Sequence, residues 1–140
     1  DIHVMTSELH GTAISGDIIP TLIDELPLIA VVAATAEGTT IIKDASELKV
    51  KESDRIALVT KNLKAMGADI EATDDGFIIN GKDGTPGPLH GAVIDDALDH
   101  RIAMSFTIAG LVSSGETEIL HPKCVSISYP DFFKGICSNN

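Results

Sequence analysis

Two long stretches of the chain are apolar on nearly every side of a helix, and a third is apolar on one side only. Residues 24–36 and 99–112 form the two apolar stretches. A helix that is hydrophobic all round must be buried all round, so both are expected inside the protein. Residues 53–66 instead show a one-sided stripe at helical spacing, made of Ile56, Val59, Leu63 and Met66. This pattern predicts a helix at the surface with one wet face.

Shorter segments rich in β-branched residues separate these helices and predict strands. The hairpin among them crosses a turn made of Thr73, Asp74 and Asp75. A final short helix is expected near residues 129–136. The predicted strands cover residues 12–14, 39–43, 68–72, 76–80, 92–94 and 116–120.

An internal repeat organises the chain. The string GTAIS at residues 11–15 is echoed by GAVID at 91–95, and AEGTTI at 36–41 by SSGETEI at 113–119. We therefore expect one domain with two copies of a strand–helix unit. The first covers about residues 11–80, residues 81–88 form a Gly- and Pro-rich linker, and an incomplete second unit covers about residues 89–140. Such units predict a layered α/β fold with short sheets.

Charge excludes several classes of partner. The chain has 10 basic and 21 acidic residues, a net charge of −11, and no cluster of Lys and Arg typical of nucleic-acid binding. We expect no nucleic acid and no anionic membrane as partner. Any anion site must therefore depend on a few positioned cations and backbone donors that overcome the negative field locally.

Cysteine usage and hydropathy favour a cytoplasmic protein, or a piece of one. Cys124 and Cys137 are too few for a disulfide framework and lie in no metal-binding pattern, so two free thiols and no metal are expected. The longest apolar run, residues 26–36, is shorter than the roughly 20 residues of a membrane span.

The two arginines, Arg55 and Arg101, lie in dense polar clusters. The first cluster is residues 49–55, KVKESDR, before the amphipathic helix. Arg55 presents a planar fork suited to a carboxylate or phosphate, and Lys51 lies four residues earlier. Glu52, next to Lys51, is a candidate for proton transfer. The alternative is an exposed helix start with Ser53 as N-cap and solvated charge pairs.

Carboxylates open both apolar helices. Asp24 precedes the first, where it either caps the helix or orients a substrate hydroxyl and accepts its proton. Asp99, His100 and Arg101 open the second, where Asp99 could simply cap the helix and pair with Arg101. Asp24 and Arg101 both lie fourteen residues before the glycine that ends their helix, Gly38 or Gly115. The repeat thus places an acid in one copy and a base in the other.

These strings resemble one protein family. LKVKESDRI at 48–56, DHRIAMS at 99–105, YPDFF at 129–133 and IDELP at 23–27 are similar to segments of the EPSP synthases, the 3-phosphoshikimate 1-carboxyvinyltransferases. The resemblance implies a fold of repeated βαβαββ units with buried helices and short mixed sheets. This chain would be the last third of such an enzyme, and the missing N-terminal portion would be its partner.

The resemblance also implies an activity. Family members transfer the enolpyruvyl group of phosphoenolpyruvate to the 5-hydroxyl of shikimate 3-phosphate, without metal or cofactor. By position, Asp24 would contact the shikimate hydroxyls and accept a proton. Lys51 would reach the reacting hydroxyl and Glu52 would handle the proton on the phosphoenolpyruvate methylene. Arg55 and Arg101 would clamp phosphoenolpyruvate.

Some features keep other functions open. Glu47 and Ser128 depart from residues that contact substrate in some family members. The related transferase that acts on UDP-N-acetylglucosamine shares the fold, although the KESDR and DHR strings argue against it. A non-catalytic anion-binding module of the same fold is the third candidate. Because the other substrate contacts of the family lie outside this chain, we expect the isolated chain to be inactive.

Overall fold

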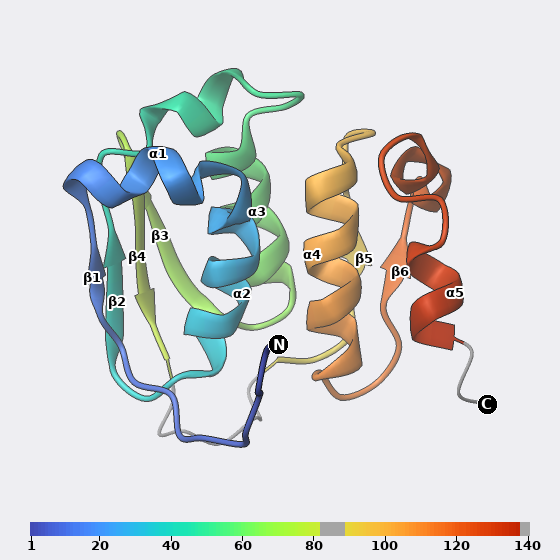
Figure 1. The fold of residues 1–140 in the computed structure, drawn as a ribbon, viewed down its shortest axis with the longest axis horizontal. Helices are drawn as coiled ribbons and strands as arrows, with labels where there is room; N and C mark the ends of the chain where they lie inside the picture. Colours follow the sequence, from blue (N-terminus) through green and yellow to red (C-terminus); the bar gives the residue numbers. More distant parts are fainter. Residues whose placement is uncertain (82–88, 138–140) are drawn as a thin grey trace.

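A four-stranded mixed sheet forms one side of the protein (Figure 1). The computed structural model describes residues 1–81 and 89–137, so the predicted linker lies almost entirely outside the described residues. The sheet has the order β1-β2-β4-β3, with β1 and β2 parallel and the other neighbours antiparallel. Its strands are β1 (Ala13–Ile14), β2 (Thr39–Ile42), β3 (Asp69–Thr73) and β4 (Gly76–Asn80). The predicted hairpin is confirmed, because Thr73 pairs with Gly76 across the turn.

A second, smaller sheet repeats the parallel pair of the first. Strand β5 (Val93–Ile94) runs parallel to β6 (Glu118–Ile119). In both sheets a glycine before the first strand donates its N–H across a 2.6 Å hydrogen bond: Gly11 to the Glu37 carbonyl and Gly91 to the Ser114 carbonyl. Short mixed sheets and helices confirm the predicted α/β class.

The helices agree with the sequence prediction in place but differ at their ends. The helix expected over 24–36 begins only at Leu26, because Ile23–Glu25 form a 3-10 turn, and the short helix α1 before that turn was not predicted. Further 3-10 turns at Gly16–Ile18, Ser46–Val50 and Pro122–Ile127 were not predicted. The helices are α1 (Ile19–Leu22), α2 (Leu26–Thr35), α3 (Arg55–Ala65), α4 (His100–Leu111) and α5 (Phe132–Cys137).

The apolar helices form the core as predicted, but they are not buried on every side, because Val32 of α2 and Leu111 of α4 are exposed. Leu26 and Ala30 of α2, and Ile102 and Phe106 of α4, are fully buried in one cluster. Helix α3 buries one stripe, and Lys61 lies on its exposed side. Residues 16–35 together are long and apolar enough, by composition alone, to cross a membrane, but a core helix of a soluble protein passes the same test.

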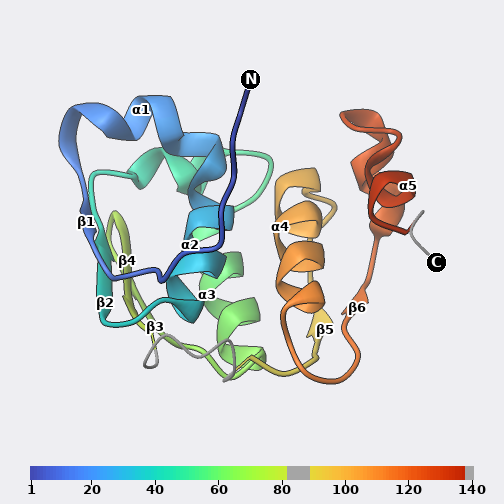
Figure 2. The same ribbon diagram turned by 60° about the horizontal axis from the view of Figure 1, so that its bottom comes forward.

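Helices α2, α3 and α4 run in the same direction beside one another. In Figure 1 each starts at the upper end of the molecule, and α4 lies between α2 and α3 on one side and β6 and α5 on the other. Figure 2 shows the same order from a second direction. Three helix N-termini therefore meet at one end of the protein, where their partial positive charges favour anions.

The close approach at Gly91 should make a methyl group there destabilising. A Cβ on Gly91 would lie 1.8 Å from the Glu116 carbonyl oxygen, whereas a Cβ on Gly135 in α5 would meet nothing within 4 Å. We expect Gly91→Ala to lower the free energy of unfolding by about 1–3 kcal/mol, measured by urea denaturation. The matched control Gly135→Ala should not lower it. Equal stability of the two variants would contradict this packing argument.

Candidate anion-binding site

Acidic residues stand at the start of all three helices at this end of the protein, and two of them cap their helix through the side chain. Glu25, Asp54 and Asp99 occupy the N-cap positions of α2, α3 and α4. The side chain of Asp54 accepts from the Ala57 N–H and that of Asp99 from the Arg101 N–H. Asp54 therefore caps α3, and the prediction that Ser53 caps it is wrong. The predicted capping role of Asp99 is confirmed.

Arg55 is buried at the centre of the site. Its side chain is 1% exposed, and its guanidinium group contacts three carboxylates. Nε donates to Asp99 Oδ2 at 2.9 Å and Nη2 to Asp99 Oδ1 at 3.1 Å, a two-point contact that fixes the plane of the fork. The interpretation of residues 49–55 as a solvated charge run is wrong for Arg55.

Asp99 is the fully buried partner of this arginine. Its Oδ2 also accepts from the Ser53 hydroxyl at 2.6 Å, and its Oδ1 from the Arg101 N–H at 3.0 Å. Burial acts to raise the pKa of Asp99, but the hydrogen bonds from Arg55 and Ser53 and the charge of Arg55 outweigh it, so the pKa lies below its usual range. The carboxylate thus remains ionised and holds Arg55 in place.

Asp24 joins Lys51 and Arg55 through one oxygen. Asp24 Oδ1 lies 3.1 Å from Arg55 Nη1 and 3.3 Å from Lys51 Nζ. Burial acts to raise the pKa of Asp24, whereas Lys51, Arg55 and Arg101 lower it, with a net decrease. Asp24 lies in the 3-10 turn before α2, whose N-cap is Glu25, so its predicted capping role is wrong.

Lys51 lies just before α3 rather than inside it. It ends the 3-10 turn at Ser46–Val50, so it and Arg55 do not share a helix face, yet both reach Asp24. Lys51 Nζ also lies 3.3 Å from Glu47, and the contacts with Asp24 and Glu47 raise the pKa of Lys51. The structure therefore brings together Asp24, Lys51 and Arg55 by a route that helical spacing did not predict.

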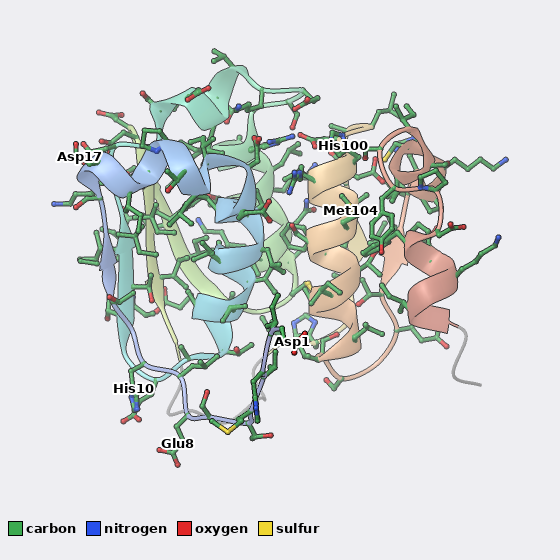
Figure 3. All side chains as sticks on the ribbon, in the orientation of Figure 1. Asp1, Glu8, His10, Asp17, His100 and Met104 are labelled. Atoms are coloured by element: carbon green, nitrogen blue, oxygen red, sulfur yellow. The ribbon has the colours of Figure 1, made fainter. Side chains whose placement is uncertain are left out.

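Arg101 lies at the start of α4, on the edge of a shallow hollow. Its Nη1 lies 2.5 Å from Glu25, so the predicted pairing with Asp99 is replaced by one with the N-cap of α2. His100, Met104 and Tyr129 also line the hollow. Figure 3 shows His100 at the top of α4 and Met104 about a turn further along.

Glu52 completes the contacts of Arg55. Its carboxylate lies 2.6 Å from Nη2 and is half exposed, as is that of Asp24, whereas Asp99 is fully buried. The guanidinium group thus has an inner contact with Asp99 and outer contacts with Glu52 and Asp24. An incoming anion could replace the outer pair without breaking the inner one.

The described residues show no metal-binding arrangement. Residues 1–81 and 89–137 contain no group of three or more His, Cys, Asp or Glu side chains that could hold an ion. Cys124 is a free, buried thiol, and burial raises its pKa, which makes it less reactive. The chemistry of this site therefore depends on fixed cations, carboxylates and helix ends.

The fold and the site define an α/β segment with short sheets that gathers cations where parallel helices begin. A family model for EPSP synthase (3-phosphoshikimate 1-carboxyvinyltransferase) matches residues 1–136. The chain belongs to this family. The expected family is thereby confirmed.

Individual relatives agree with the family model. The chain is 55% identical over 132 residues to the 3-phosphoshikimate 1-carboxyvinyltransferase of Alkaliphilus oremlandii, covering 94% of this chain and 30% of the relative. For the Thermoanaerobacter sp. enzyme of the same name, the identity is 57% over 134 residues, with 96% and 31% covered. A solved EPSP synthase from Acinetobacter baumannii superposes with a TM-score of 0.85 at 44% identity, covering 91% of this chain and 29% of that one. The chain thus spans about a third of the length of these relatives.

The buried pair between Arg55 and Asp99 predicts a pH-dependent stability. Because the folded pKa of Asp99 lies below the unfolded value of about 3.9, the ionised carboxylate stabilises the fold above that pH. Its contribution is lost as pH falls towards the folded pKa. We expect Asp99→Asn to lower the free energy of unfolding by about 3 kcal/mol at pH 7. The decrease should become progressively smaller below about pH 4. Urea denaturation between pH 7 and 3 measures both.

The exposed residue Asp17 provides the control for this pH series. Asp17→Asn removes the same charge away from the site and should change stability little at any pH. If the free energies of unfolding of Asp99→Asn and the unchanged chain differ by the same amount across the whole pH range, the link between the pKa of Asp99 and stability is contradicted.

Proposed function

We propose that the full-length protein containing this chain transfers the enolpyruvyl group of phosphoenolpyruvate to the 5-hydroxyl of shikimate 3-phosphate. The products are 5-enolpyruvylshikimate 3-phosphate and phosphate. One observation supports this proposal most. Arg55 is held by the carboxylate of Asp99 at the end of the protein where three helices begin. Family membership supplies the reaction, and the site supplies a physical reason why an anion with a planar carboxylate would bind here.

Arg55 would hold phosphoenolpyruvate through its outer contacts. Asp99 accepts hydrogen bonds from Nε and Nη2 of Arg55. The other two carboxylates are half exposed: Glu52 contacts Nη2 and Asp24 contacts Nη1. A substrate carboxylate that replaces these two would find the fork already oriented. Arg101, a third exposed and at the edge of the hollow, would close the clamp from α4.

Three further residues would assist the reaction, two of them by proton transfer and one by its charge. Asp24 would bind the shikimate hydroxyls and accept a proton, because Lys51 and the arginines keep it ionised. Lys51 lies on the same Asp24 oxygen and would neutralise charge that develops at the reacting hydroxyl. Glu52, which the incoming carboxylate would release from Arg55, would be free to exchange a proton with the methylene group.

This chain alone has too few cations for trianionic substrates. Lys51, Arg55 and Arg101 contact five carboxylates, those of Asp24, Glu25, Glu47, Glu52 and Asp99. The side chains of the site therefore carry a net negative charge before any substrate binds, and only the helix N-termini add partial positive charge. The remaining portion of the enzyme would have to supply the missing positive charge.

We accordingly expect the isolated 140-residue chain to show no turnover of shikimate 3-phosphate and phosphoenolpyruvate, measured as phosphate release. The full-length protein should release phosphate under the same conditions. Measurable turnover by the isolated chain would overturn the argument from charge. Activity of the full-length protein with UDP-N-acetylglucosamine alone would instead favour the related transferase, and activity with neither acceptor a binding module.

Arg55→Lys in the full-length protein tests the role of the fork. Lysine retains a positive charge but loses the planar two-point contact. We expect kcat/KM for phosphoenolpyruvate to fall by about 100-fold, or about 2.7 kcal/mol. The control is Lys64→Ala, which removes an exposed cation from the last turn of the same helix and should leave kcat/KM within about twofold. Similar losses in the two variants would contradict the assigned role.

A further inference from the structure

The loop that delivers Asp99 to Arg55 has a strained backbone. Ala97 and Leu98 are consecutive non-glycine residues with positive φ angles of 47° and 62°. Each such residue is disfavoured by contact between its Cβ and the backbone, and persists only when the surroundings hold it. The loop joins β5 to α4, so its conformation sets where Asp99 lies.

Hydrogen bonds to residues outside this loop hold it at two points. Asn62 of α3 donates from Nδ2 to the Asp95 carbonyl at 2.8 Å and accepts the Asp95 N–H on Oδ1 at 3.1 Å. On the other side, fully buried Asp96 accepts from the His121 N–H at 2.6 Å. The first of these tethers joins the loop to the same helix that carries Arg55.

The side chain of Asn62 is directed entirely at this loop. The residue is 1% exposed, and both polar atoms of its amide contact the backbone of a single residue more than thirty positions away. Burying an amide is costly unless it is paired, and an apolar side chain would fill the same place on α3 without that requirement. The amide therefore specifies a backbone position that packing alone would not fix.

We propose that Asn62 is a positioning residue that orients Arg55 for phosphoenolpyruvate by fixing the strained loop that carries Asp99. Arg55 and Asn62 both lie on α3, whereas Asp95 and Asp99 bracket the loop. The hydrogen bonds between Asn62 and Asp95 and the ion pair between Arg55 and Asp99 thus connect the helix to both ends of the loop. This inference rests on the proposed function for its kinetic consequence.

Asn62→Ala in the full-length protein tests the proposal. We expect kcat/KM for phosphoenolpyruvate to fall about tenfold, which corresponds to about 1.4 kcal/mol. In an Arg55→Lys background, the same substitution should change kcat/KM by less than about twofold. If Asn62 acts through Arg55, the effects of the two substitutions are not additive. A tenfold loss in both backgrounds would show that Asn62 does not act through Arg55 and would overturn the proposal.

Val59→Ala is the matched control for stability. Val59 is fully buried on α3 as part of the hydrophobic core. It should lower the melting temperature as Asn62→Ala does, yet leave kcat/KM for phosphoenolpyruvate within about twofold. If Val59→Ala reduces kcat/KM as much as Asn62→Ala does, the effect of Asn62 is on stability alone and the proposal fails.

Leu98→Gly provides a variant that is not expected to unfold. Leu98 is two-thirds exposed, and glycine accepts its positive φ without strain, so the melting temperature should stay the same or rise. Because the loop becomes free to move, kcat/KM for phosphoenolpyruvate should still fall by several-fold, and unchanged kcat/KM would count against the proposal.

An independent readout separates this inference from the proposed function. The chain contains only two arginines, so a ¹⁵N spectrum of the 140-residue chain shows two Nε–H signals. The signal of Arg55 should exchange with water faster in Asn62→Ala than in the unchanged chain, because its bond to Asp99 weakens. If exchange accelerates while the unchanged full-length protein has no turnover, the proposed function fails and the positioning role remains. Unchanged exchange contradicts the positioning role, whatever the activity.

Discussion

The buried ion pair between Arg55 and Asp99 is the constraint on which the site depends. Two charges with 1% and 0% exposure must satisfy each other, because removing one partner leaves an uncompensated buried charge that costs about 3–5 kcal/mol. The pair joins Arg55 in the first turn of α3 to Asp99 before α4, residues that are 44 positions apart in the sequence. Helices α3 and α4 therefore cannot shift independently without breaking it. Because Asp99 keeps Arg55 in place, a substrate could replace the outer contacts of Arg55 with Asp24 and Glu52 without displacing the guanidinium group.

Converging helix N-termini would attract anions, yet this chain fills them with its own carboxylates. Glu25 and Asp99 occupy the N-cap positions of α2 and α4, and each pairs with an arginine. The carboxylates keep the cations in place while no substrate is present. The half-exposed ones, Asp24 and Glu52, are the ones that a substrate could displace. Burial thus separates the structural carboxylate from the exchangeable ones around the same guanidinium group.

The sequence predicted what periodicity and repetition encode, and it missed what depends on long-range contacts. Helices α2, α3 and α4 and the hairpin follow from apolar spacing, and the paired glycines follow from the repeat. The 3-10 turn before α2 was not predicted, because Asp24 and Glu25 also suit the first turn of an α-helix, where acidic side chains are favoured. The Asp99–Arg55 pair gave no local signal either, since its members are far apart in sequence and Asp99 also suits an N-cap.

Opposite charges meet at the ends of the two apolar helices, since Asp24 lies in the 3-10 turn before α2 and Arg101 in the first turn of α4. Asp24 and Arg101 precede the equivalent glycines by the same number of residues, and the helices that follow them pack against each other in the same direction. Had both copies kept an acid, the two carboxylates would repel at the joined N-termini. With a base in the second copy, Arg101 instead lowers the pKa of Asp24 and pairs with its neighbour Glu25. The packing of α2 against α4 thus forms a site with both acid and base at its centre.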